Sequence, residues 1–351
     1  MIRVLIPDMP TADELLPWLR LIDTTRHYVK GGPLVQQLQC ELAALTGAPC
    51  TAVANGTVSL ELALRAMALP QGAGVLVPAV TFIATAQAII NAGLSPVLHD
   101  VSADTWQLDA AAATEVALHS RSIRCALPVA SFGRAVPVGP WERFAYDTNL
   151  PVLIDAAGAI YDQQASPDPD IVVSCSLNAT KAIGAGEGGI VSTCDLILGE
   201  RVAQLANFGP GGTNARMSEY HAAVALASIR HNSERDWRTP LCARYAERLP
   251  AIAMLGPQIA GQSARTMLPA LLPPHCSAVA VGAALAAAGV ESRCWYRPLL
   301  DERPELIGCA RIGDLAVTAM LRERLIGLPY HALLTEPDVD RVCSALAEAI
   351  A

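Results

Sequence analysis

Short apolar runs alternate with amphipathic segments along most of the chain, and this alternation constrains the fold more than any other feature. Apolar residues recur at spacings of three and four over Leu60–Met67 and Ala84–Ile90, as in helices. The runs between such segments are typical of buried strands; they are Val75–Val77, Pro96–Leu98, Cys125–Val129, Val152–Ile154, Ile171–Cys175 and Ile190–Ser192. Because strands that alternate with helices pair in parallel, we expect an α/β protein with a sheet covered on both faces.

The pattern changes near residue 235. A polar helix predicted over Arg230–Arg248 leads into a stretch containing Pro and Gly, and two further helices are predicted at Ala278–Ala288 and Glu336–Ala349. We therefore expect a large α/β domain with a mostly parallel sheet over residues 1–235. A smaller C-terminal α+β domain would follow over residues 236–351, and the first 30 or so residues could pack on it.

Composition excludes several classes of protein. Hydrophobic residues make up 52% of the 351 residues and charged residues 17%, which rules out intrinsic disorder. The net charge of −8 argues against a general affinity for nucleic acid or anionic membranes. The best apolar run, Val279–Val290, falls short of the roughly 20 residues that a membrane span needs. We therefore expect neither nucleic acid nor membrane as a partner.

The cysteines and the N-terminus favour a cytoplasmic location. The ten cysteines contain no C-x-x-C pair and the seven histidines no H-x-x-x-H, so no metal site is predicted. Asp8 and Pro10 interrupt the region where a signal peptide would carry its apolar run. The cysteines are interpreted as buried thiols in a reducing cytoplasm.

One glycine-rich segment imitates a dinucleotide-binding fingerprint. Gly184–Gly189 matches G-x-G-x-x-G, a pattern that binds pyrophosphate only when it opens a helix. Here Ile190–Thr193 follows, which is typical of a strand. We therefore predict a tight loop that needs positive φ, not a nicotinamide site.

Three segments, far apart in sequence, carry residues suited to chemistry. In Ala54–Ser59, Gly56 permits close backbone approach, and Thr57 offers a hydroxyl and free amides at a helix start, as phosphate requires. Asp155 follows three apolar residues, which places a carboxylate at the carboxyl end of a strand. For both segments an ordinary helix cap is the alternative.

The third segment, Ser174–Lys181, has two serines before a lysine amid mostly uncharged residues. A desolvated Lys181 would have a lowered pKa and could form a Schiff base, whereas a solvated loop lysine is the alternative. Together, a phosphate cradle, a strand-end carboxylate and this lysine are the parts needed to hold pyridoxal 5′-phosphate (PLP).

These segments resemble the DegT/DnrJ/StrS sugar aminotransferases, PLP enzymes of fold type I, and the resemblance runs through nearly the whole chain. The blocks are similar to the family's in order and spacing. They are Asn55-Gly56-Thr57, Val77–Thr85, Asp155-Ala156-Ala157, Ser176–Lys181 with Gly186–Gly189, Thr213–Ala223 and Leu328-Pro329-Tyr330.

The resemblance implies a role for each matching residue. Lys181 would hold PLP as a Schiff base and later carry the proton, Asp155 would pair with the pyridine nitrogen, and Phe82 would stack on the cofactor ring. The phosphate would be bound by residues of both subunits of a homodimer with shared active sites: Gly56, Thr57 and Ser176 of one chain and Asn214 of its partner.

The implied reaction is a ping-pong transfer of an amino group from glutamate or glutamine to a keto-sugar nucleotide. Gly158 and Ala130 depart from the family, which usually has Gln or His at the first position and His at the second. These departures leave two alternatives open. One is an enzyme of the same fold with a non-nucleotide keto substrate or a specialised PLP reaction, and the other is a PLP-binding protein with little turnover.

Overall fold

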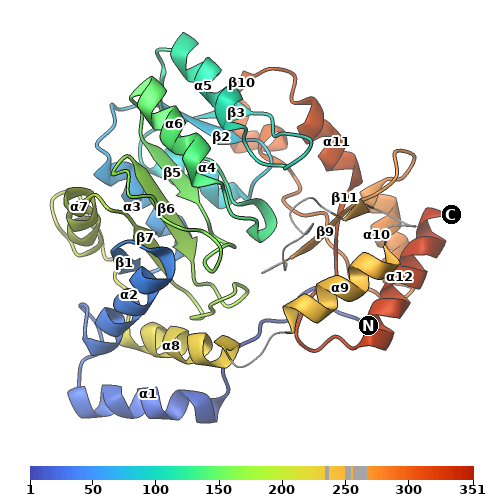
Figure 1. Ribbon diagram of the computed structural model, residues 1–351, viewed down its shortest axis with the longest axis horizontal. Helices are drawn as coiled ribbons and strands as arrows, with labels where there is room; N and C mark the ends of the chain where they lie inside the picture. Colours follow the sequence, from blue (N-terminus) through green and yellow to red (C-terminus); the bar gives the residue numbers. More distant parts are fainter. Residues whose placement is uncertain (234–236, 250–253, 256–266) are drawn as a thin grey trace.

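The computed structural model describes residues 1–233, 237–249, 254–255 and 267–351. Within these residues the chain forms an eight-stranded sheet, which Figure 1 shows edge-on among its helices, and a smaller three-stranded sheet. In spatial order the strands of the large sheet are β1 (Cys50–Val53), β7 (Gly189–Ser192), β6 (Ile171–Ser176), β5 (Val152–Asp155), β4 (Ile123–Ala126), β2 (Gly74–Pro78), β3 (Ser95–His99) and β10 (Ala310–Ile312).

The prediction of a mostly parallel α/β sheet is confirmed. The strands from β6 to β10 pair in parallel, whereas β7 is antiparallel to both of its neighbours, β6 and β1. Strand β7 is antiparallel to β6 because no crossover helix connects them; the chain turns back through the loop at residues 177–188. That loop contains the glycine segment, with Gly186 at φ +81°, so the fingerprint precedes a strand as predicted.

Helices cover both faces of the large sheet, as the fully apolar strands require. One core lies under α2 (Pro33–Thr46), α5 (Ala110–His119), α6 (Val138–Thr148) and α8 (Glu219–Ser233). The other lies under α3 (Gly56–Ala66), α4 (Ile83–Asn91) and α7 (Leu196–Ala206). Alternate residues of β6 divide between them: Val173 belongs to the first core and Val172 to the second.

The small sheet is antiparallel and lies to the right in Figure 1, beside three helices that share a core with it. Its strands are β11 (Leu325–Leu328), β9 (Leu268–Leu271) and β8 (Met254–Leu255). The helices are α9 (Arg238–Arg248), α10 (Ala278–Ala287) and α12 (Glu336–Ile350). Further elements are α1 (Ala12–Thr25), α11 (Ala316–Arg324) and the 3₁₀ helices η1 (Ser131–Gly133), η2 (Leu300–Glu302) and η3 (Pro304–Leu306).

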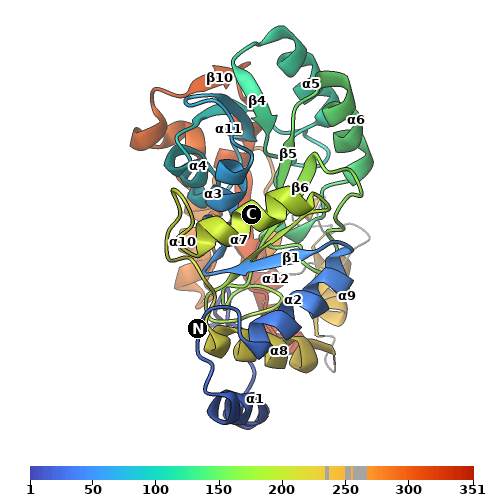
Figure 2. The same ribbon diagram turned by 90° about the vertical axis from the view of Figure 1, so that its left-hand side faces the viewer.

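The N-terminal residues pack with the small sheet, and a strand from the C-terminal part of the chain joins the large sheet. Ile2 forms a bridge with Val290 and belongs to the core of the small sheet, whereas β10 pairs with β3 of the large one. The C-terminus directly follows α12, and in the second view β10 lies at the end of the molecule away from α1 (Figures 1 and 2). Residue 235 lies outside the described residues, so the division of the chain there stays a prediction.

Two predictions from the sequence are wrong in part. The single helix expected over Arg230–Arg248 is two helices, because α8 ends at Ser233 and α9 begins at Arg238. Pro240 accounts for the second start, since proline has no N–H and is tolerated only in the first turn of a helix. The cysteines are not all buried: Cys40 is exposed, because it lies on α2 opposite the face formed by Leu38 and Leu42.

No helix among the described residues is long and apolar enough to cross a membrane.

Candidate active site

A cavity of about 870 Å³ lies at the carboxyl ends of the central strands. It is the place where open α/β sheets bind ligands. Six of the seven residues predicted from the sequence line it: Gly56, Thr57, Phe82, Asp155, Ser176 and Lys181. Asn214 is not among the described residues of its wall. It lies in the segment between α7 and α8, where its Oδ1 accepts a hydrogen bond from Nε of Arg216 at 3.1 Å.

Asp155 is the last residue of β5, and its carboxylate is buried with 5% exposure. Thr85 Oγ1 donates to one carboxylate oxygen at 2.8 Å and the backbone N–H of Ala157 to the other at 3.1 Å. A turn follows instead of a helix, so the alternative of a helix cap is wrong. Burial raises the pKa of Asp155, although these bonds and the nearby Lys181 oppose the rise.

Lys181 lies in the loop between β6 and β7, with its side chain in the cavity wall. Burial lowers its pKa, and the charge of Asp155 opposes the shift only partly. The side chain is therefore not the fully solvated loop lysine of the alternative interpretation. A lowered pKa increases the fraction of neutral amine, the form that attacks a carbonyl carbon.

The start of α3 presents free amides to the cavity. Asn55 caps this helix, because its Oδ1 accepts the N–H of Val58 at 2.9 Å, so Thr57 is the second residue of the helix and not the cap. No described residue accepts the amide hydrogens of Gly56 and Thr57. Amides at a helix start, beside the hydroxyls of Thr57 and Ser176, suit a phosphate group.

Gly56 is required for packing as well. A Cβ atom at this position would lie 2.7 Å from Cβ of Ser176, closer than side chains pack. The glycine thus lets the first turn of α3 approach the end of β6, which places Thr57 and Ser176 on the same part of the cavity wall. The sequence predicted that Gly56 lets the backbone approach a ligand, which stays a prediction; the structure shows a second reason for glycine, the close approach to Ser176.

Phe82 precedes α4 and is 57% exposed, which is unusual for an aromatic ring in the wall of a cavity. Its ring leaves apolar surface open to a planar ligand. Ala157 lines the same cavity and is small enough to let such a ligand approach Asp155.

Sequence reasoning missed part of the wall. Thr85 was within a family block but was given no role, although it binds Asp155 directly. A second group comes from the segment after α10, whose individual side chains were given no role from the sequence. Its members are Arg293, Cys294, Trp295, Tyr296, Arg297 and Arg303. Among them, Tyr296 stacks on Phe132 with 5.0 Å between ring centroids.

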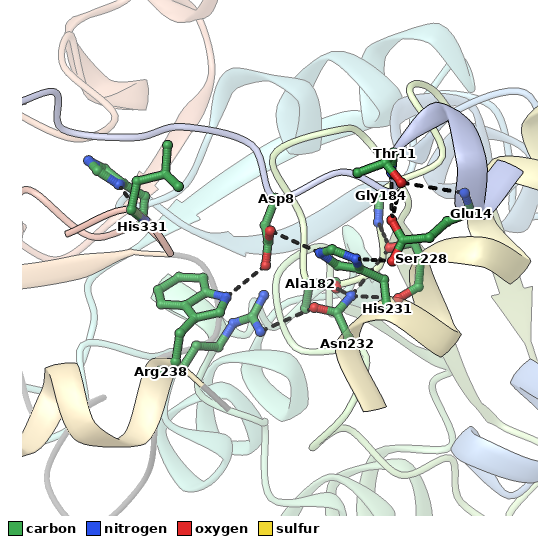
Figure 3. Close-up of polar contacts among 12 residues, drawn as sticks. Asp8, Thr11, Glu14, Ala182, Gly184, Ser228, His231, Asn232, Arg238 and His331 are labelled. Atoms are coloured by element: carbon green, nitrogen blue, oxygen red, sulfur yellow. Dashed lines mark hydrogen bonds and ion pairs between the residues drawn. The ribbon is translucent and has the colours of Figure 1, made fainter. Parts of the chain in front are cut away.

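Helix α8 holds the loop that carries the lysine. Figure 3 shows Asn232 and Ser228 pointing toward this loop. Nδ2 of Asn232 donates to the carbonyl oxygen of Ala182 at 2.7 Å, and Oγ of Ser228 accepts the N–H of Gly184 at 3.1 Å. These two bonds fix the backbone directly after Lys181.

His231, also on α8, joins the N-terminal segment to this helix (Figure 3). Its two ring nitrogens lie 3.1 Å from a carboxylate oxygen of Asp8 and 2.9 Å from one of Glu14. Burial disfavours the charged ring, but the hydrogen bonds to Glu14 and Asp8 outweigh it and raise the pKa of His231. The two carboxylates favour the imidazolium, because only the charged ring has a proton to donate from each nitrogen.

The residues present fit PLP. Lys181 offers an amine for its aldehyde, Asp155 a buried carboxylate for its pyridine nitrogen, and the start of α3 free amides for its phosphate. The two departures from the family pattern, Gly158 and Ala130, both line the cavity. Neither has a side chain that can hydrogen-bond the phenolic oxygen of the cofactor.

Comparison with known proteins agrees with a site for PLP. The model of the DegT/DnrJ/EryC1/StrS aminotransferase family matches residues 13–347. GDP-perosamine synthase of Caulobacter vibrioides is 30% identical over 319 residues, which cover 84% of each chain. 3-Amino-5-hydroxybenzoate synthase of Amycolatopsis mediterranei is 30% identical over 260 residues, 68% of this chain and 66% of the relative. The crystal structure of DesI with its TDP-sugar product superimposes with a TM-score of 0.91 at 28% identity, covering 99% of this chain and 93% of DesI.

Proposed function

Because the chain belongs to the DegT/DnrJ/EryC1/StrS aminotransferase family, we propose that it transfers an amino group from glutamate or glutamine to a keto-sugar nucleotide. It is a transferase of amino groups, and PLP is its cofactor. The observation that carries the proposal is the pair formed by Lys181 and Asp155, which line one cavity. Burial there lowers the pKa of the amine and raises that of the acid.

The two members of the pair have different tasks in this proposal. Lys181 would hold PLP through its side-chain amine, and the same amine, in its neutral form, would move the proton at the reacting carbon. Asp155, held by Thr85 and the amide of Ala157, keeps a proton on the pyridine nitrogen. PLP supplies the electron sink that makes this proton labile.

The phosphate site is proposed to be shared between two subunits. The amides of Gly56 and Thr57 and the hydroxyls of Thr57 and Ser176 face the cavity of their own chain. Asn214 does not line that cavity, which fits a role in the neighbouring site of a homodimer. The cytoplasmic location inferred from the sequence stays a prediction.

The acceptor is proposed from the relatives and from the cavity. GDP-perosamine synthase is named for a nucleotide sugar, and the structure of DesI was determined in the presence of its TDP-sugar product. The cavity wall extends beyond the PLP-binding residues to Arg293, Arg297 and Arg303, which leaves room for a second substrate. 3-Amino-5-hydroxybenzoate synthase is not named for a nucleotide, so a non-nucleotide keto acceptor is the second candidate. A PLP-binding protein with little turnover is the third.

The test is an absorbance spectrum of the PLP-loaded protein, recorded before and after addition of L-glutamate. We expect the visible band of lysine-linked PLP, its loss when glutamate is added, and its absence in Lys181→Ala. Lys30→Ala, which removes an exposed lysine outside the cavity wall, is the control and should keep the band. A band that persists in Lys181→Ala would contradict the role of the lysine. A wild-type band that no donor changes would favour the third candidate.

A further inference from the structure

The loop that carries Lys181 is held differently on the two sides of the lysine. Before it, the loop holds itself, since the N–H of Lys181 donates to the carbonyl oxygen of Asn178 at 2.8 Å. After it, no backbone group of the described residues bonds the carbonyl oxygen of Ala182 or the N–H of Gly184. Side chains of α8 bond both groups instead, so the backbone after the lysine depends on a helix that is distant in sequence.

The two side chains lie on one face of α8. Ser228 and Asn232 are four residues apart, about one helical turn, and Figure 3 shows both beside the loop. Ser228 is fully buried, so its hydroxyl meets the N–H of Gly184 without competition from water. Nδ2 of Asn232 has two hydrogens, and its closest acceptors are the carbonyl oxygens of Ala182 at 2.7 Å and Ser228 at 2.9 Å. Helix α8 therefore supplies one acceptor and one donor to the loop.

Arg238 on α9 fixes the orientation of the Asn232 amide. Its Nη1 donates to Oδ1 of Asn232 at 3.3 Å. Because a guanidinium only donates hydrogen bonds, the amide oxygen has to face Arg238, and the amide nitrogen is left to face Ala182. The bond to the loop is thus tied to a helix that packs with the small sheet.

The N-terminal segment packs against the same part of the loop. A Cβ atom at Gly184 would lie 2.5 Å from Sδ of Met9, so a side chain at this position would have to displace the methionine. The neighbouring Asp8 is anchored, since it accepts a hydrogen bond from Nε1 of Trp237 at 2.8 Å and lies 3.1 Å from a ring nitrogen of His231. The backbone after Lys181 therefore contacts both α8 and an anchored N-terminal segment, and both restrict its movement.

We propose that Asn232 and Ser228 are positioning residues, which fix the direction in which Lys181 enters the cavity by holding the backbone directly after it. A lysine side chain is a long, flexible stem, so its amine stays within reach of one reacting atom only if its backbone is fixed. Neither Asn232 nor Ser228 is among the described residues of the cavity wall, so they act through the loop and touch no substrate. The proposal rests on the proposed function, to which it adds the residues that place the reacting amine.

The first experiment is acetylation of the PLP-free protein with acetic anhydride at a series of pH values, measured by mass spectrometry. The chain has two lysines, so the exposed Lys30 is a reference for Lys181 in every sample. Burial lowers the pKa of Lys181, and a loop released from α8 would admit water to the amine. We therefore expect the midpoint of Lys181 labelling to move to higher pH in Ser228→Ala and in Asn232→Leu.

The second experiment measures the rate at which excess glutamate removes the visible band of the PLP-loaded protein. Each variant should lose roughly 2- to 10-fold in this rate, the usual effect of losing one hydrogen bond between neutral groups. The glutamate concentration that gives half of the maximal rate should stay that of the wild type, because neither side chain contacts a substrate.

Ser233→Ala is the matched control. It removes a serine hydroxyl from the exposed side of the same helix, where Oγ donates to the carbonyl oxygen of Arg230 at 2.7 Å. Its labelling profile and its rate should be those of the wild type. Alanine and leucine both favour helices, so the two test variants should keep α8.

Wild-type labelling profiles and rates in both test variants would overturn the positioning role, even if urea denaturation showed a loss of stability. A higher glutamate requirement at an unchanged maximal rate would assign the two residues to substrate binding and overturn it as well. If glutamate fails to change the band of the wild type, the proposed function fails, while the labelling profiles still test whether α8 places Lys181.

Discussion

Replacing Thr85 by valine tests whether the buried carboxylate depends on its one side-chain donor. Thr85 is 1% exposed and donates to Asp155 at 2.8 Å, and valine has nearly the same shape, so the change removes this bond and the neutral one to Thr81 without opening a cavity. A hydrogen bond to a charged group contributes about 1.5–3 kcal/mol. We therefore expect the free energy of unfolding of Thr85→Val to be lower than that of the wild type by about this amount at neutral pH.

The pH dependence of this loss has a definite sign. Burial raises the pKa of Asp155 in the folded protein, and the bond from Thr85 opposes the rise, so Thr85→Val raises this pKa further. An acid with a raised folded-state pKa destabilises the fold once it ionises. The difference in the free energy of unfolding between the wild type and Thr85→Val should therefore be largest above the raised pKa of Asp155. It should shrink as the pH falls through this pKa.

The assay is urea denaturation of the PLP-free protein, followed by circular dichroism. The control is Thr81→Val: Oγ1 of Thr81 lies 2.9 Å from Oγ1 of Thr85, so this variant loses only a neutral bond, at about 1 kcal/mol. Asp155→Asn completes a double-mutant cycle. Two results would refute the charged hydrogen bond: a loss of stability in Thr85→Val no larger than that in Thr81→Val, or an equally large loss from Thr85→Val when Asn is at position 155.

Two further variants probe packing and charge. Gly56→Ala would place a Cβ atom 2.7 Å from that of Ser176, so we expect a loss of about 1–3 kcal/mol and weaker PLP binding, measured by urea denaturation and PLP titration; unchanged values would show that the start of α3 yields freely. In the wild type, the pKa of His231 is raised, so its bonds to Asp8 and Glu14 stabilise the fold fully below pH 6.5 and less as the pH rises through the raised pKa. His231→Gln should lack this decline. If the free energies of unfolding of the two proteins differ by the same amount at every pH from acid to alkaline, the charged ring is contradicted.

The parts of the site that depend on local sequence could be predicted. Asp155 and Ser176 end strands whose buried residues are continuous runs, so the apolar pattern alone located the sheet edge where ligands bind. Lys181 was placed by its neighbours and by its spacing from Gly186–Gly189. These signals lie within a few residues of the groups they identify.

The missing parts depend on contacts between distant segments. Strand β10 has three residues, two of them exposed, and only its pairing with β3 makes it a strand. Asn55 and Thr57 are both residues that cap helices, and only the position of the helix start identifies Asn55 as the cap of α3. Arg297 and Arg303 carry no spacing signature, since a loop brings them to the cavity.

The pairing of early segments of the chain with late ones has a consequence for biosynthesis. As the protein emerges from the ribosome, β3 is made early, but its outer edge has no partner until Ala310–Ile312 follows. In the same way, Ile2 has no bridge partner until Val290 has been synthesised. An open strand edge is prone to pair with other chains. The nascent protein therefore carries this exposed edge until nearly all of it has been translated, and the cell has to keep it from aggregating for that long.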